Sequence, residues 1–201
     1  MHVLLLTPAR THRGGDPLPQ LTAALAPLGL RRPAERTRGD EAIVVADRAE
    51  QAVDVIRVAS ELGSWCIGLG VGAVEKPVPE EIRALRGPAV DAAREALHAA
   101  RTTAQVPLAV RAGDARQAGT AADAEAVLRL IGWMIATRNT GQWRVVRALR
   151  ERPGITQRDL AEHLGITQQT VSRSLKTSGW REERAAHPLL VRLLSMIDLT
   201  S

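Results

Sequence analysis

Apolar residues recur at helical spacing in a short stretch near the carboxyl end of the chain, residues 156–175. The apolar positions of this stretch are Leu160, Ala161, Leu164, Ile166, Val171 and Leu175. They give two short segments one apolar face each. Gly165 between the segments permits the positive φ that ends a helix, and the Thr167 hydroxyl can cap the helix that follows. The pattern predicts two helices joined by a tight turn, in helix-turn-helix spacing.

The second of these helices carries polar side chains away from its apolar face. They are Gln168, Gln169, Thr170, Ser172, Arg173 and Lys176. Glutamine pairs with an adenine edge and arginine with a guanine edge, while serine and threonine bond bases or phosphates. We therefore predict double-stranded DNA as a partner, with these residues and Thr167 at the interface and Arg158 on the DNA backbone. The alternative is an ordinary pair of surface helices, whose exposed faces are also polar.

The first 118 residues alternate between short apolar runs and helical patterns. Strands are expected at 2–6, 31–37, 42–46, 65–72 and 107–110, and helices at 20–29, 47–62 and 88–101. The first six elements follow the order of the ferredoxin-like arrangement, in which an antiparallel sheet carries helices on one face. We predict the α+β class, with a ferredoxin-like N-terminal domain followed by an all-α helix-turn-helix domain.

A small, polar segment at 113–120 is expected to link the two halves, with Thr120 or Asp123 capping the next helix. The expected domains are 1–118, a connecting helix at 119–139, and a DNA-binding unit at 140–201. Two very apolar segments, 127–135 and 188–197, flank this unit. They predict a homodimer paired through these helices, as in the MarR family. Packing of the tail over its own module is the alternative.

Charge supports the interpretation of the carboxyl half. Residues 140–184 hold nine lysines or arginines and five acids, whereas the first 139 residues are nearly balanced, so most of the net charge of +5 lies here. Such a patch would contact phosphates and make binding salt-dependent. The chain has no Phe or Tyr and four Trp residues, which argues against an aromatic platform for single strands.

Other compositional features bound the class of protein. No apolar run approaches the roughly 20 residues of a membrane span, and the first residues lack a signal-peptide pattern, so we expect a cytoplasmic protein with no membrane partner. Cys66 lies in a strand-like segment and is expected to be an inert core thiol. The five histidines show no metal-ligand spacing, and we expect no metal site.

Three short motifs carry a family resemblance. RGDE at 38–41, CIGLGVG at 66–72 and GPAVDAAREAL at 87–97 together resemble the SatD family of small bacterial proteins. That resemblance implies a core similar to GGDEF-type nucleotide cyclases, followed by a MarR-like helix-turn-helix. In the cyclases the turn lies beside nucleotide phosphates and acidic groups hold a divalent metal. The matching positions are Gly39, Asp40 and Glu41.

This chain departs from the cyclase pattern, because the first strand ends at Thr7 without a metal-binding acid and Ala42 replaces an aromatic residue. The RGDE segment is also what a plain hairpin turn requires, since Gly and Asp tolerate turn dihedrals. A retained nucleotide or other ligand site, with or without magnesium, and an active cyclase are the alternatives. The loop at 73–87 either covers an anion with residues such as Arg83 and Arg86 or is a solvated surface.

Together these patterns predict a sequence-specific transcription regulator that acts as a homodimer, whose first domain supports assembly or senses an unidentified small molecule. We expect no enzymatic activity and no cofactor. A nucleotide cyclase-like enzyme or nucleotide sensor with a DNA-binding appendage is one alternative, and a protein-interaction module is another.

Overall fold

The computed structural model describes residues 1–9, 15–63 and 65–199. Within these residues one mixed sheet has the strand order β2–β3–β1–β4–β5. The strands are β1 His2–Pro8, β2 Glu35–Arg36, β3 Ala42–Ala46, β4 Trp65–Val71 and β5 Leu108–Ala112. β1 runs antiparallel to both β3 and β4, whereas β4 and β5 are parallel. The chain is therefore of the mixed α and β type, and the name ferredoxin-like stays a prediction.

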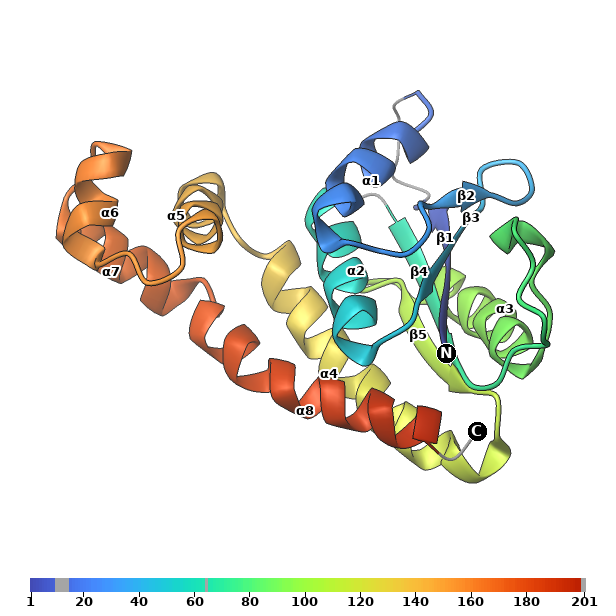
Figure 1. Cartoon of the computed structure of the whole chain (residues 1–201). Helices are drawn as coiled ribbons and strands as arrows, with labels where there is room; N and C mark the ends of the chain where they lie inside the picture. The colour runs from blue at the N-terminus through green and yellow to red at the C-terminus, as the bar shows by residue number, and fades with distance from the viewer. Residues whose placement is uncertain (10–14, 64, 200–201) are drawn as a thin grey trace.

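Helices cover both faces of the sheet (Figure 1). One face carries α1 Leu18–Leu25, α2 Ala49–Leu62, α4 Ala118–Ala136 and α8 Trp180–Leu199, and the other carries α3 Pro88–Arg101. Alternate residues of β1 serve the two cores, with Leu4 facing the first and Leu5 the second. α3, which connects the parallel neighbours β4 and β5, thus lies on the face opposite to α1 and α2.

The CIGLGVG segment lets α3 approach β4 closely. Gly68 and Gly70 face the helix backbone, where a methyl group on Gly70 would overlap backbone atoms of Ala89 and Ala93. α3 presents alanines at these positions, so two small surfaces meet. In this structure the glycines of the segment serve helix–sheet packing.

Two sequence expectations about the edges of this domain were wrong. The edge strand expected at 31–37 is only β2, and Pro33, which has no N–H to donate to a ladder, precedes it. The Arg32 guanidinium donates to the carbonyls of Pro79 and Glu80. The expected linker at 113–120 is a short 3₁₀ turn, Ala115–Gln117, that runs into α4. Asp114, rather than Thr120 or Asp123, caps the turn by accepting a hydrogen bond from the Arg116 N–H.

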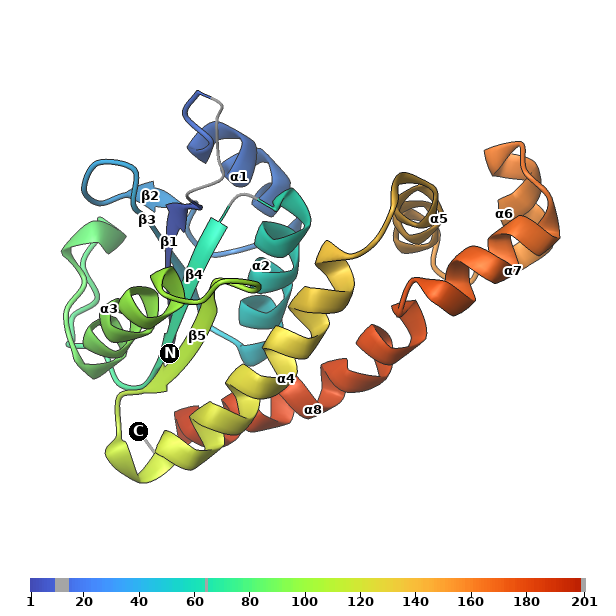
Figure 2. The same cartoon turned by 180° about the vertical axis from the view of Figure 1, so that it is seen from behind.

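The last helix returns to the first domain. α8 begins at Trp180 rather than Pro188, and it packs along α4 and α2 (Figures 1 and 2). Leu190 and Leu194 are buried there together with Ile131 of α4. Pro188 is tolerated inside the helix on its exposed side. The buried stripes of α4 and α8 thus pack mainly on the sheet domain of their own chain, and not over the helix-turn-helix as the alternative to subunit pairing expected.

None of the helices in the described part of the chain is long and apolar enough to cross a membrane. Cys66 is buried in β4, as its apolar setting predicted.

We expect Gly70→Ala to destabilise the protein by about 3 kcal/mol or more, because the added methyl group must push α3 away from β4. The control is Gly119→Ala, in α4, where an added methyl group meets open space. This change should be neutral or stabilise the helix by about 0.5 to 1 kcal/mol. Urea unfolding of both variants measures the difference, and equal free energies of unfolding would contradict the close-packing account.

Candidate nucleic-acid interface

Three short helices follow α4 and form a unit at the end of the molecule away from the sheet (Figures 1 and 2). They are α5 Thr140–Glu151, α6 Gln157–Leu164 and α7 Gln168–Thr177. Each begins with a side-chain cap, since the first orphan N–H groups of a helix need an acceptor. Asn139 and Gln142 form a reciprocal capping box on α5, and Thr156 caps α6.

The turn between α6 and α7 has the geometry that the sequence predicted. Gly165 adopts φ of +63°, and its N–H donates to the Glu162 carbonyl at 3.1 Å while the Ile166 N–H donates to Ala161 at 3.0 Å. These bonds close the end of α6. The Thr167 hydroxyl then accepts from the Thr170 N–H at 3.1 Å and starts α7. The turn and the cap at Thr167 are therefore confirmed.

A separate small core holds the three helices together. Its buried members are Val145, Ala148, Leu160, Ala161, Leu164, Val171 and Leu175. Ala161 is buried between the helices, where a larger side chain would separate them. The apolar positions expected from the sequence are thus the packed positions of this unit, with Ile166 partly buried beside them.

The residues predicted to contact DNA lie on the outside of this unit. Arg158, Thr167, Gln168, Gln169, Thr170, Ser172, Arg173 and Lys176 are all exposed. Arg173 and Lys176 form no ion pair with any carboxylate of the described residues, so both cations remain available to an anionic partner. The structure brings these side chains together on and beside α7.

Two polar residues that we did not single out from the sequence fix the position of α7. The Gln142 amide donates to the Thr177 carbonyl at 3.1 Å and to the Thr177 hydroxyl at 2.9 Å, and the Arg144 guanidinium donates to the Leu164 carbonyl at 2.6 Å. These hydrogen bonds join α5 to the end of α7 and to the end of α6. Apolar periodicity carries no signal for such contacts, because the acceptors are mostly backbone atoms.

Glu183 of α8 is the centre of a buried ion-pair cluster, which we define as Arg138, Arg150, Glu183 and Glu61. One Glu183 oxygen accepts from Arg138 at 2.5 Å and the other accepts from Arg150 at 2.6 Å. Arg150 also pairs with Glu61 of α2. Burial lowers the pKa of Arg150, and the Glu183 carboxylate acts in the opposite direction. The cluster therefore joins the three-helix unit, α8 and the sheet domain.

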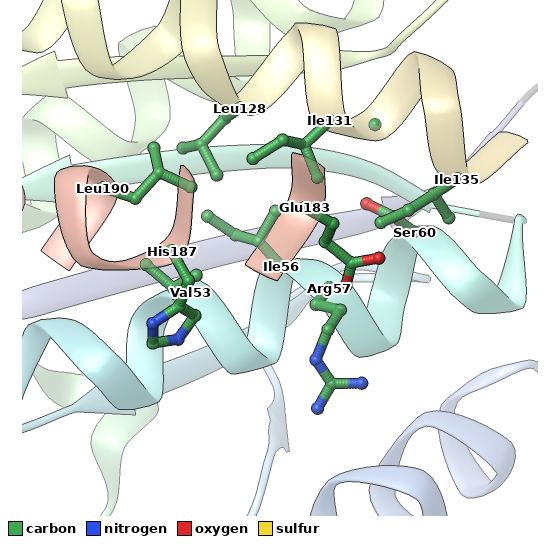
Figure 3. A pocket seen from close by; sticks show the side chains of 11 residues that line it. Val53, Ile56, Arg57, Ser60, Leu128, Ile131, Ile135, Glu183, His187 and Leu190 are labelled. Atoms are coloured by element: carbon green, nitrogen blue, oxygen red, sulfur yellow. The ribbon is translucent and has the colours of Figure 1, made fainter. Parts of the chain in front are cut away.

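Tryptophan rings and a small cavity surround this cluster. The guanidinium of Arg138 lies 5.1 Å from the Trp143 ring centre, and that of Arg150 lies 5.1 Å from the Trp180 ring centre, within cation–π range. Figure 3 shows Glu183 at the side of a cavity of about 30 Å³ between α2, α4 and α8. The cavity is lined mainly by aliphatic side chains and has room for little more than water.

The acidic turn proposed as a ligand site lies far along the chain from α7, at the β2–β3 hairpin. Gly39 adopts φ of +52°, and the exposed Asp40 carboxylate lies 3.7 Å from the Arg36 guanidinium. Glu41 accepts a hydrogen bond from the Thr37 hydroxyl at 2.7 Å. Among the residues that the structure describes, no three His, Cys, Asp or Glu side chains gather where they could hold a metal ion. The geometry of the turn is that of a hairpin.

A model of the MarR family matches residues 137–177, which include α5, α6 and α7 and make up about one fifth of the chain. No curated protein and no solved structure matches the chain. Nothing in these comparisons bears on the SatD-like or GGDEF-like interpretation of the first 118 residues, which stays a prediction.

Replacing Glu183 by Gln should destabilise the protein by about 3 kcal/mol, because two guanidinium groups lose their shared buried counter-charge. Glu182→Gln is the matched control, since this neighbour is exposed and the change should cost less than about 1 kcal/mol. Thermal unfolding of both variants tests the point. Identical melting temperatures would show that the ion-pair cluster does not hold α8 against the three-helix unit.

Proposed function

We propose that this protein is a sequence-specific DNA-binding transcription regulator that acts as a homodimer, and that its sheet domain supports assembly or senses a ligand. The observation that carries the proposal is the exposed polar and cationic face of α7, on a helix-turn-helix whose caps and core hold it rigidly. The MarR family match over the same helices supports it. The proposed role is binding and regulation rather than catalysis.

In this proposal α7 lies in the major groove and its first turns meet the base edges. Gln168 and Gln169 at the start of the helix are suited to adenine, and Arg173 is suited to guanine. Lys176 and Arg158 contact phosphates and contribute affinity without sequence preference. Within the described residues 178–199 no strand follows α7, so a wing of the β-hairpin type contributes no contact from this segment.

Pairing of two subunits is proposed from the surface that α4 and α8 leave uncovered. Among the described residues the exposed large apolar side chains are Val78, Leu130, Trp133, Leu189, Met196 and Leu199. All but Val78 lie on these two helices. A second copy of the chain covering this face would bury apolar area, and the two copies of α7 would then have to reach half-sites that lie about 34 Å apart, one turn of DNA. A dimer that reads two half-sites distinguishes its DNA sequence from other sequences far better than one subunit does.

Arg173→Ala should weaken binding to a cognate duplex by about 1 to 3 kcal/mol and relax the base preference at one position, because a guanine edge loses its bidentate donor. Selection from a random duplex library followed by fluorescence anisotropy supplies the site and the affinity. Arg101→Ala removes the same charge from the exposed end of α3 and should leave the affinity unchanged. Wild-type affinity for the cognate site in the Arg173 variant would refute the role of α7.

Trp133→Asp should shift the protein from dimer to monomer, because a carboxylate would enter an apolar contact between subunits. The tryptophan is 53% exposed within one chain, so the change leaves the packed core intact. Ala23→Asp, on the exposed side of α1, is the control. Sedimentation velocity measures the assembly, and a wild-type protein that stays monomeric at all concentrations would rule out this pairing.

A further inference from the structure

A pocket of about 410 Å³ lies on the α3 side of the sheet, away from the DNA-binding helix. Its floor consists of the aliphatic side chains Leu5, Ile43, Leu85 and Val90, which are almost fully buried. Its rim consists of Arg38, Arg83, Arg86, Arg94, Thr37 and Glu41. The rim thus holds four guanidinium groups and one carboxylate around an opening of the size typical for small ligands.

Arg38 and Arg86 provide the strongest reason to expect an anion. Neither forms an ion pair with a carboxylate of residues 1–9, 15–63 or 65–199, and Arg86 instead donates to the carbonyls of Ala84 and Leu85. Arg83 and Arg94 pair with Glu81 and Asp91, both at 2.8 Å and both well exposed, so these pairs are weak and can be exchanged. Within the described residues, the one acid of the rim, Glu41, accepts a hydrogen bond from the Thr37 hydroxyl and forms no ion pair with the rim arginines.

The rim is anchored at defined positions. The loop between β4 and α3 closes on itself through the Glu75 N–H and the Arg86 carbonyl at 2.9 Å. Glu35 of β2 accepts hydrogen bonds from the backbone N–H groups of Ile82 and Arg83 at 3.2 and 3.3 Å. The hairpin, the loop and α3 therefore present their arginines from three different directions around one opening. These anchors reduce the cost of ordering the loop backbone when a ligand binds.

We propose that this pocket binds a small molecule with two or more linked phosphate groups. Guanidinium groups form paired, charge-assisted hydrogen bonds with phosphate oxygens, and the apolar floor excludes water from one side of those bonds. A single phosphate engages only part of the rim, whereas linked phosphates reach arginines from the hairpin and from α3 together. The proposal deepens the ligand-sensing role proposed above and rests on it only for what binding does to DNA recognition.

Isothermal titration of the full chain with inorganic triphosphate, at fixed ionic strength and without divalent metal, tests the proposal. We expect saturable binding of one equivalent, and binding of orthophosphate at least about tenfold weaker. Arg38→Gln and Arg94→Gln should each weaken triphosphate binding about tenfold or more, which corresponds to one lost charge-assisted contact. Both residues are exposed, so the variants should fold normally, and thermal unfolding checks this.

Two further variants locate the bound anion. Arg101→Gln removes an exposed charge at the far end of α3 and should bind triphosphate as the wild type does. Arg173→Gln should also bind normally, whereas a loss confined to this variant would place the anion on the DNA-binding surface and overturn the proposal. Absence of saturable binding by the wild type, or wild-type affinity in both pocket variants, would also overturn it.

Failure of this proposal can be told apart from failure of the regulator proposal, because the titration contains no DNA. Triphosphate binding that depends on Arg38 supports the pocket even where no duplex is recognised. Specific duplex binding that depends on Arg173, together with no binding of triphosphate, leaves the regulator and removes the pocket.

Discussion

The arrangement of the three-helix unit on the sheet domain depends on the ion pairs that the buried Glu183 carboxylate makes. This carboxylate receives one guanidinium from the segment that leads out of α4 and another from α5, which itself reaches Glu61 of α2. Neither half of the chain can move independently without separating charges that are shielded from water, and this separation is costly. The cluster therefore gives the three-helix unit a fixed orientation on the sheet domain.

The two long helices α4 and α8 connect the sheet domain to the three-helix unit. α4 leads away from the sheet towards the three-helix unit, and α8 returns from α7 to pack beside α4 (Figures 1 and 2). Their inner faces complete the core of the sheet domain, and their outer faces carry the apolar side chains proposed for pairing.

Charge divides the surface into two regions with different proposed partners. The exposed face of α7 offers cations and amides, which suit the base edges and phosphates of a duplex. The pocket on the α3 side offers arginines around a concave opening with an apolar floor, which suits a compact anion. The sheet lies between the pocket and the helices of the opposite face, of which α2, α4 and α8 all contact its strands.

Local patterns in the sequence determined most of the secondary structure and the helix-turn-helix. Gly165, Thr167 and the apolar spacing around Ala161 specify that turn through contacts within about 20 residues, and α3 was predicted with its correct bounds. Tertiary structure alone decided that α8 returns to the sheet, that Arg138 and Arg150 share Glu183, and that arginines from the hairpin, the loop and α3 surround one pocket. The physical reason is that periodicity reports which side of an element is apolar, whereas the choice of a charged or backbone partner depends on segments that only folding brings together.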